Sequence, residues 1–257
     1  QSVGRFPITS VWPSVDGGRY PAKAFVSEVI EFGCVAFREG HDALAVELII
    51  TDPKGATTRY AMLPGSPGLD QWKKSLQLNL EGVYRFQIAA YDDVFETWHH
   101  NTEIKLEAGI DQELMMLEGK RLASRFSEKS KRDFEQIIKA FDSEKDPQKA
   151  FARTLSLGFK DLAKANPLYD LQTLSEEFEV LCERTLAGSG SWYEFFPRSE
   201  GAKQNKDGSI TSGTFKTAVK SLDRVVQMGF EILYLPPVHP IGSAFKKGKN
   251  NSLNAGE

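Results

Sequence analysis

The feature that most constrains the fold is a single β-α-β pattern in the last quarter of the chain. An apolar strand candidate at 191–196 is followed by a helix pattern that starts at Thr214 and ends at Gly229. A second apolar run follows at 230–235. Parallel strands are normally covered on both faces, and one β-α-β unit has too few residues to cover its own strands. We therefore expect the sequence to be cut inside this domain, with the rest of the domain lying elsewhere, disordered or deleted.

Residues 1–107 have the pattern of short antiparallel strands. Turn signals such as Asp52-Pro-Lys-Gly55 and the Pro-Gly-rich run at 64–68 separate apolar or alternating stretches. Strands are expected near 25–30, 34–37, 44–50, 59–63, 72–80, 83–91 and 102–106. This pattern predicts an immunoglobulin-like β-sandwich.

The hydrophobic period becomes helical over 108–187. Apolar residues recur three or four positions apart in 114–122 and 134–141, and Asp146-Pro147 is a helix-start signal. Ser175 precedes two glutamates, which predicts another helix start. The basic, proline-interrupted stretch at 160–168 is expected to be a connection. We predict a small helical bundle here, ahead of the parallel α/β domain at 188–257.

Composition and charge exclude several classes of protein. Hydrophobic residues make up 40% of the 257 residues and charged residues 26%, which is globular rather than disordered composition. The net charge of −3 provides no basic field for nucleic acid or an anionic membrane, and no apolar run is long enough to span a bilayer. Cys34 and Cys182 belong to no CxxC pair, and no signal segment follows Gln1. A cytoplasmic protein without a metal or cofactor is expected.

No common catalytic motif is present. The sequence contains no Walker loop, no GxGxxG after a strand, no GxSxG elbow and no HExxH. On residue chemistry alone, an enzyme fragment and a binding module therefore remain equally open.

The segment after the second apolar run of the β-α-β pattern has the leading binding candidates. In parallel α/β folds, ligands bind at the carboxyl ends of strands, and lysines with glycines there can hold a phosphate or a polyhydroxyl ligand. For the lysines alone a solvated loop is the favoured interpretation, whereas for the histidine a ligand role and a packed role are balanced. The candidates are His239, Lys246, Lys247, Lys249, Asn250 and Asn251.

Three polar residues at or after the first strand candidate are weaker candidates. Carboxylates at strand ends can act as acids or bases, but no second carboxylate at a defined spacing accompanies Glu194 and Glu200. We interpret both, together with Arg198, as structural.

The aromatic residues and cysteines of the first two regions also have competing roles. Trp12, Trp72 and Trp98 could stack on sugar rings, although tryptophans of a sandwich are more often core or interface residues. His99 and His100, adjacent on an expected strand, would point to opposite faces and form no metal site by themselves. The last residues of interest are interpreted as structural, one in an apolar run and one on the expected helix: Cys34 and Cys182.

Several segments of the chain resemble a known enzyme family. The runs 191–199 (SWYEFFPRS), 213–222 (GTFKTAVKSL) and 228–242 (MGFEILYLPPVHPIG) look like the start of the catalytic barrel of glycoside hydrolase family 13. Within it, the bacterial α-1,4-glucan:maltose-1-phosphate maltosyltransferases are most similar. Their loop after the second barrel strand resembles 246–251 (KKGKNN), and their amino-terminal sandwich resembles 37–44 (FREGHDAL), 81–86 (EGVYRF) and 95–99 (FETWH). The resemblance covers nearly the whole chain.

The resemblance implies an activity for a longer parent protein. It would transfer a maltosyl unit from α-maltose 1-phosphate to the non-reducing end of an α-1,4-glucan with retention of configuration. Retention needs a carboxylate nucleophile and a carboxylic acid about 5 Å apart. In the family these groups follow barrel strands four and five, so this chain, with only the first two strands of a (β/α)₈ barrel, contains neither catalytic group.

The resemblance also implies a binding residue and a partner. The donor-binding lysine that follows strand two in the family matches Lys247 best, with Lys246 and Lys249 as alternative registers. A homodimer built through the sandwich and the helical region is implied as well. Two alternatives stay open: a non-catalytic carbohydrate-binding or dimerisation module, and another family 13 enzyme, such as a branching enzyme or a trehalose-forming hydrolase.

Overall fold

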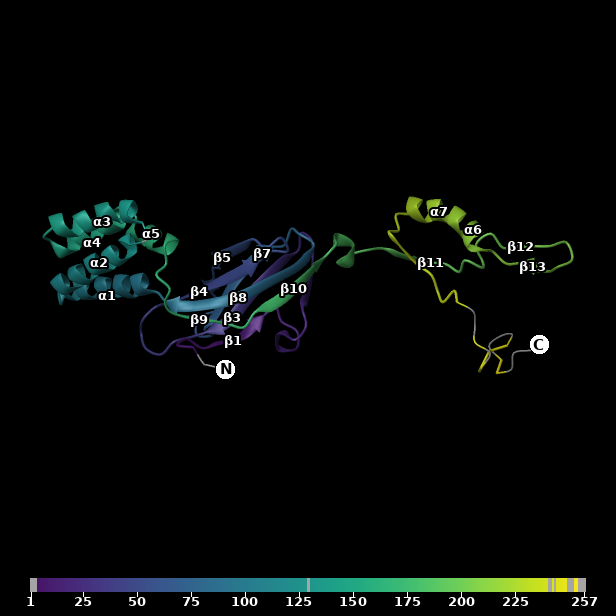
Figure 1. Cartoon of the computed structure of the whole chain (residues 1–257), viewed down its shortest axis with the longest axis horizontal. Helices are drawn as coiled ribbons and strands as arrows, with labels where there is room; N and C mark the ends of the chain where they lie inside the picture. Colours follow the sequence, from purple (N-terminus) through teal and green to yellow (C-terminus); the bar gives the residue numbers. More distant parts are fainter. Residues whose placement is uncertain (1–3, 129, 240–241, 243, 249–251, 254–257) are drawn as a thin grey trace. The chain divides into compact units, whose positions relative to one another are not determined.

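Two structural units make up the chain, Gln1–Arg184 and Thr185–Glu257. A computed structural model describes residues 4–128, 130–239, 242, 244–248 and 252–253. Figure 1 shows β-sheets and helices in the first unit and a small α/β arrangement in the second.

A four-stranded antiparallel sheet forms one wall of the first unit. Its strand order is β1 (Ile8–Trp12), β3 (Val29–Ala36), β7 (Gln71–Gln77) and β6 (Leu63–Pro64). The pairing of β1 with β3 contains an irregularity between Thr9 and Trp12, after which Trp12 lies opposite Gly33.

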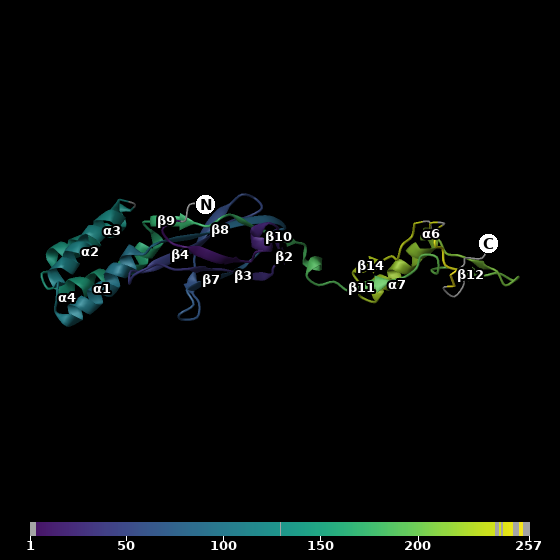
Figure 2. The same ribbon diagram turned by 90° about the horizontal axis from the view of Figure 1, so that it is seen from below.

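A six-stranded sheet forms the other wall. Its order is β2 (Ala22–Phe25), β10 (Phe178–Glu183), β8 (Gly82–Asp92), β4 (Leu44–Thr51) and β5 (Thr57–Ala61), and β9 (Asp170–Leu174) also pairs with β8. β10 is parallel to β2 and antiparallel to β8. Figure 2 shows β2 beside β10.

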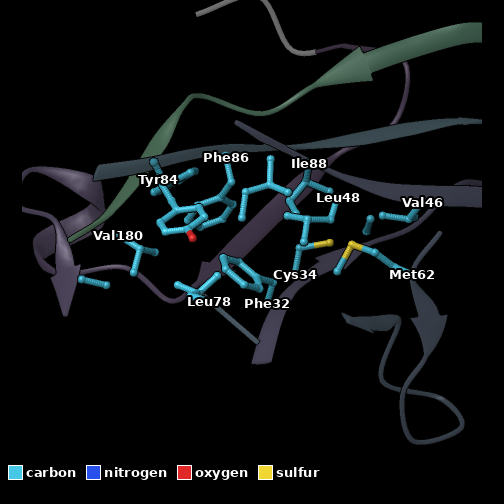
Figure 3. Close-up of a cluster of buried hydrophobic side chains, with 14 of the residues drawn as sticks. Phe32, Cys34, Val46, Leu48, Met62, Leu78, Tyr84, Phe86, Ile88 and Val180 are labelled. Carbon is cyan, nitrogen blue, oxygen red and sulfur yellow. The ribbon is translucent and has the colours of Figure 1, made fainter. Parts of the chain in front are cut away.

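The two sheets share one hydrophobic core. Figure 3 shows Phe32 and Cys34 of β3 facing side chains of β4 and β8. The rings of Phe32 and Phe86 meet edge to face with centroids 5.0 Å apart, and Phe86 stacks on Phe178 at 5.6 Å. Such contacts between facing sheets come from strands whose alternate residues point inward. The prediction of a β-rich amino-terminal region accompanied by helices is confirmed.

Five helices follow β8 and pack on one another. They are α1 (Val94–Ala108), α2 (Gln112–Ser127), α3 (Lys131–Ser143), α4 (Pro147–Ser156) and α5 (Phe159–Ala165). Phe159 is fully buried among aromatic rings of the other helices, those of Phe95, Trp98, Phe126, Phe134 and Phe141. The helices expected at 114–122, at 134–141 and after Asp146 are confirmed. The connection expected at 160–168 is wrong in its first part, because α5 extends to Ala165 and buries Phe159 and Ala163 in the helical core.

The strand expected at 102–106 is wrong, because these residues belong to α1. Asp93 caps this helix through a side-chain oxygen that accepts the backbone N–H of Glu96 at 2.9 Å. The buried positions of α1 then recur at helical spacing, at Phe95, Trp98, His99, Thr102 and Leu106. Three of these positions precede residue 102, so the segment 102–106 is too short to show the helical period to which it belongs.

The helix expected after Ser175 is also wrong, because Phe178–Glu183 is strand β10. Phe178, Val180 and Cys182 are buried while the residues between them are not, which is the period of two of a strand. Ser175 does not cap a helix. Its hydroxyl accepts the Ile88 N–H at 2.9 Å, and its own N–H donates to the Ile88 carbonyl at 2.8 Å, which fixes this segment to β8.

In the order of the chain, the five helices thus lie between two strands of the six-stranded sheet, β8 and β9, rather than after the sheets. The chain leaves at β8, forms α1–α5, and returns through β9 and β10 to the same six-stranded sheet. Every helix in the described part of the chain is too short or too polar to cross a lipid bilayer.

The second unit contains the β-α-β arrangement expected from the sequence. β11 (Trp192–Glu194) pairs in parallel with β14 (Ile232–Tyr234), and between them lie α6 (Phe215–Ala218), a 3-10 turn at Val219–Ser221 and α7 (Leu222–Gln227). The polar loop expected between strand and helix also contains a hairpin of β12 (Lys203–Gln204) and β13 (Ile210–Thr211). Figure 2 shows α7 alongside β11 and β14.

Candidate functional site

The helical segment between the two parallel strands starts and stops where the sequence predicts. The Thr214 hydroxyl accepts the Thr217 N–H at 3.3 Å, while the Thr217 hydroxyl accepts the Thr214 N–H at 2.8 Å. This reciprocal pair satisfies two donors at the helix start. At the other end Gly229 has a φ of +82°, the left-handed conformation that glycine adopts at little cost. The chain is therefore turned back toward β14.

The register of the two strands brings their carboxyl ends together. Glu194, the last residue of β11, lies opposite Tyr234, the last residue of β14. The segments 195–198 and 235–239 consequently leave the sheet at one edge. In parallel α/β folds this edge is the usual place for a ligand.

A small hydrophobic cluster lies between the two strands and the helical segment. Phe195, Ala218 and Val225 are buried, and Tyr193 packs on Phe230 with ring centroids 5.0 Å apart. The cluster fixes α6 and α7 against one face of the two strands.

Glu200 fastens the loop after β11 to the helical segment. Its carboxylate accepts the Ser221 hydroxyl at 2.5 Å and lies 3.2 and 3.3 Å from Nη2 of Arg224. Arg224 also donates to the Tyr193 hydroxyl at 3.0 Å, and this hydrogen bond raises the pKa of Arg224 above its usual value. A carboxylate held by two partners in this way is a structural clamp rather than a free acid or base, in line with the structural interpretation expected for Glu200.

Gly213 permits the close approach of this loop to the helix start. A Cβ at Gly213 would lie 2.2 Å from the Glu200 carbonyl oxygen and 2.6 Å from that of Pro197. The Gly213 N–H donates to the Arg198 carbonyl at 2.7 Å. Only glycine leaves room for this contact, so the position of Glu200 depends on it.

The remaining candidates near the edge are exposed. Glu194, Arg198 and His239 are all exposed, and the Arg198 guanidinium lies 5.0 Å from the centroid of the Phe196 ring. Lys246 and Lys247 are exposed on the segment after β14. The other three predicted candidates, Lys249, Asn250 and Asn251, lie outside the described residues.

Apolar side chains of this unit lie uncovered on both the sheet and the helices. Trp192 and Tyr234 are neighbours on the two strands and are 61% and 46% exposed. On the helical segment Val219 is 60% and Val226 69% exposed, although both belong to the apolar face expected from the sequence. These side chains are the surface that a larger parallel α/β structure would cover.

With this geometry in view, comparisons with known proteins decide the family. A family model described as alpha-1,4-glucan:maltose-1-phosphate maltosyltransferase, domain N/S, matches residues 4–184. This chain belongs to that family.

Named relatives extend the similarity through the second unit. An alpha-1,4-glucan:maltose-1-phosphate maltosyltransferase 1 of Streptomyces coelicolor is 38% identical over 260 residues, which cover 98% of this chain and 38% of the relative. An Arcanobacterium haemolyticum maltosyltransferase is 38% identical over 265 residues, covering 99% and 38%. A Mycobacterium tuberculosis maltosyltransferase is 34% identical over 282 residues, covering 98% and 40%. The chain thus spans about two-fifths of the length of these relatives.

The tryptophan and histidine candidates all lie within residues 4–184, which match domain N/S. Some of them lie in the sheets and the others in the helices. Trp98 lies in the helical core, not in the sheets, and its Nε1 donates to the Met115 carbonyl at 2.9 Å. His99 and His100 follow it on helix α1, so their expected placement on a strand is wrong. His99 is buried, with Nδ1 3.7 Å from a Glu103 carboxylate oxygen, and His100 is exposed.

Both cysteines of this chain are buried in the core between the two sheets of the first unit. Burial raises the pKa of the Cys34 thiol to about 12 and also raises the pKa of Cys182. Cys182 lies on β10 rather than on the expected helix, and it is buried there. Among the described residues, no group of three or more His, Cys, Asp or Glu side chains is placed to hold a metal ion.

One buried polar cluster was not recognised from the sequence. Glu47 on β4 is 7% exposed, accepts the Tyr91 hydroxyl at 2.9 Å, and pairs with Nε of Arg59 at 2.7 Å. Burial and the neighbouring carboxylate raise the pKa of Tyr91. Glu47 interrupts the apolar run 44–50, and that single acid was the available signal. Because its partners already satisfy it, we assign this cluster to the architecture of domain N/S.

Proposed function

We propose that this chain is the amino-terminal part of a longer enzyme that transfers maltosyl units from α-maltose 1-phosphate to the non-reducing end of an α-1,4-glucan. The observation that supports this most is the extent of the similarity. Relatives that are named maltosyltransferases align with 98% or more of the chain, including the β-α-β unit beyond the domain N/S match.

The second unit is proposed to be the first β-α-β of a (β/α)₈ barrel. The exposed apolar side chains on both its strands and its helices support this assignment, because neighbouring strands and helices of a barrel would cover them. The two sheets that enclose one core in the first unit support an immunoglobulin-like sandwich that carries an inserted helical bundle.

Transfer with retention is proposed to proceed by double displacement. One carboxylate attacks the anomeric carbon while a second carboxyl group assists departure of the phosphate. The second group then takes the proton of the incoming glucan hydroxyl, whose oxygen attacks the same carbon and displaces the first carboxylate. Of the two carboxylates near the strand ends, Glu200 is engaged by Ser221 and Arg224, and Glu194 is exposed. Because Glu200 is already engaged and the family resemblance implies that both catalytic groups follow later barrel strands, we assign these groups to the part of the parent protein beyond this chain.

Lys247 is proposed to bind the maltosyl phosphate donor. It is exposed on the segment after β14, past the strand edge where ligands of parallel α/β folds bind. An ammonium group at this place can contact a sugar hydroxyl or the phosphate as a point charge. Lys246 and Lys249 are the alternative registers of the same match.

A homodimer formed through the first unit, in the cytoplasm, completes the proposal. Exposed apolar side chains gather near the connection of α1 and α2 and support an interface there: Ile104, Ile110, Leu114 and Leu117. The two cysteines are unpaired, as they would be in a reducing compartment.

The direct test is an assay of the gene product that contains this chain. Incubated with α-maltose 1-phosphate and glycogen, it should release phosphate and lengthen the glucan chains by two glucose units at a time. Absence of both products contradicts the proposal. Glycogen binding without either product favours the non-catalytic binding module, and branching or hydrolysis favours another family 13 activity.

A matched pair of variants tests the lysine. Lys247→Ala should raise the KM for maltose 1-phosphate about tenfold or more, because a charged contact to the donor is lost. Lys246→Ala removes an equally exposed charge from the neighbouring position and should leave this KM within about twofold of wild type. If the two results are exchanged, the register is wrong by one residue. If neither variant changes the KM, the assignment fails.

A further inference from the structure

Trp12 lies on the outer face of the four-stranded sheet. In β3, Phe32 and Cys34 point into the core (Figure 3), so Gly33 between them faces outward. Trp12 is the cross-strand partner of Gly33. By contrast, Trp72 packs against the core and donates its Nε1–H to the Ala36 carbonyl at 3.0 Å.

The indole of Trp12 lies directly on the backbone of β3. A Cβ at Gly33 would come within 2.0 Å of Cζ2 and 2.2 Å of Cε2 of Trp12. Glycine at position 33 therefore allows the ring to settle on the strand. The irregular pairing between Thr9 and Trp12, where Ser10 has a φ of +48°, is the kind of bulge that redirects a side chain.

Two charged side chains border the ring and fix its orientation. Trp12 Nε1 donates to Glu31 Oε1 at 3.3 Å, and Lys73 Nζ pairs with the same oxygen at 3.0 Å. Lys73 Nζ also lies over the Trp12 ring, 5.8 Å from its centroid, so a ligand that stacks on this face would meet the flexible Lys73 side chain. The Glu31 and Lys73 side chains are 46% and 40% exposed, so both remain available to an external ligand.

The register extends this arrangement across the sheet. Trp12, Gly33, Lys73 and Leu63 occupy one row over four neighbouring strands. With strands about 4.8 Å apart, the row is about 14 Å long, enough for a few sugar units. The flanking outward positions of β7 are polar, at Gln71 and Ser75.

We propose that this face is a secondary, non-catalytic binding surface for an α-1,4-glucan chain. A sugar ring offers C–H groups on its face and hydroxyls at its rim. A fixed indole plane bordered by a carboxylate and an ammonium group matches both features. The choice of α-glucan rests on the proposed function. A polymer held here would raise the local concentration of chain ends near the enzyme.

Affinity electrophoresis of the intact gene product, in gels that contain glycogen, tests this inference. Trp12→Ala should weaken glycogen binding about tenfold, the size expected for loss of one stacking contact. Gly33→Ala, which must displace the ring, should weaken binding in the same direction. The matched control is Tyr20→Ala, because Tyr20 is an exposed aromatic residue of the same unit, and its loss should leave binding unchanged.

Lys73→Ala keeps the inference testable if Trp12→Ala fails to fold, because it removes one hydrogen-bonding group from an exposed side chain and should weaken binding about threefold. If the wild type and the Trp12→Ala, Gly33→Ala and Lys73→Ala variants bind glycogen with equal affinity, the inference is overturned even if maltosyl transfer is observed. Conversely, glycogen affinity that depends on Trp12 in a protein without transferase activity would refute the proposed function and leave the binding surface intact.

Discussion

The two units of this chain use similar local signals but differ in how much they bury. In the first unit Phe86 is 1% and Ile88 0% exposed, because a second sheet covers the strand that carries them. In the second unit only one face of β11 and β14 is covered, and Trp192 remains 61% exposed. Cover by neighbouring elements, rather than strand or helix propensity, separates a unit with a buried core from one whose apolar side chains stay exposed.

The physical reason lies in how parallel and antiparallel sheets are built. Two antiparallel sheets can enclose a core and leave their outer faces in water, whereas parallel strands normally need cover on both faces. The first unit encloses its core between its own two sheets. The second unit satisfies the need for cover only if further strands and helices pack on Trp192, Tyr234 and Val226.

The largest expected effect is the loss of a ring from the core of the first unit. Phe86→Ala should lower the free energy of unfolding by about 3–5 kcal/mol, because a cavity remains between Phe32 and Phe178. Urea unfolding followed by circular dichroism would measure it. Val29→Ala, at a position 65% exposed, is the control and should stay within about 0.5 kcal/mol. Equal effects of the two variants would mean that the core does not stabilise this unit.

A polar replacement on the helical face of the second unit should depend on what covers it. In the 257-residue chain, Val226→Ser should change stability by less than about 0.5 kcal/mol, because Val226 is 69% exposed. In the proposed longer protein, where further elements would cover Val226, the same change should cost about 1.5–3 kcal/mol, the value of burying a valine. The comparison fails if the cost is the same in both.

The Glu200 clamp should have a smaller effect that is confined to the second unit. Glu200→Ala removes the contacts to Ser221 and Arg224 and should destabilise this unit by about 1 kcal/mol, as partly exposed ion pairs do. Proteolysis in the loop at 198–212 should accelerate, and the unfolding of the first unit should not change. Glu194→Ala, which removes an exposed carboxylate from the same unit, should not accelerate it. Acceleration by both variants would show a general loss of charge rather than a clamp.

The smallest expected effects concern pH and have opposite signs in the two units. Burial raises the pKa of Asp93 above its ordinary value of 3.8, so the folded first unit loses stability as the pH rises from 3.8 through the raised pKa. Hydrogen bonds from Ser209 lower the pKa of Asp207, so its contribution is present above 3.8 and is lost as the pH falls through the lowered pKa. Asp93→Asn should reduce the first dependence and Asp207→Asn the second.

Unfolding midpoints of each unit, measured from acidic to neutral pH, would check these signs. Asparagine is suitable at position 93 because it can still cap α1. If Asp93→Asn and Asp207→Asn shift the pH dependence of their units' unfolding midpoints with the same sign, the assignment of burial to Asp93 and of hydrogen bonding to Asp207 is contradicted.

The sequence predicted those helices and strands whose position is set by neighbouring residues in the chain. The β-branched run at 44–50 became β4, and the Thr214 and Gly229 signals bound the helical segment of the second unit. Among the predictions that failed, two show a longer period or a distant strand deciding the outcome. Residues 102–106 complete a helix capped at Asp93, and Phe178–Glu183 is a strand because β2 and β8 offer open edges to it.

The candidate sites show the same limit. The sequence placed the lysine-rich segment after β14, because strand ends are visible in the sequence. It did not indicate that Glu200 contacts Arg224, or that Trp12 lies on Gly33, since both contacts depend on tertiary register. Residue spacing alone contains no information about such contacts.

Amide hydrogen exchange of the 257-residue chain, compared with that of the longer gene product, tests the central difference between the units most directly. The account predicts slow exchange at Phe86 and Ile88 in both proteins, and fast exchange at Ile232–Tyr234 in the 257-residue chain that becomes slow in the longer protein. Slow exchange throughout β14 in the 257-residue chain alone would show that the second unit needs no further cover, and would contradict the account.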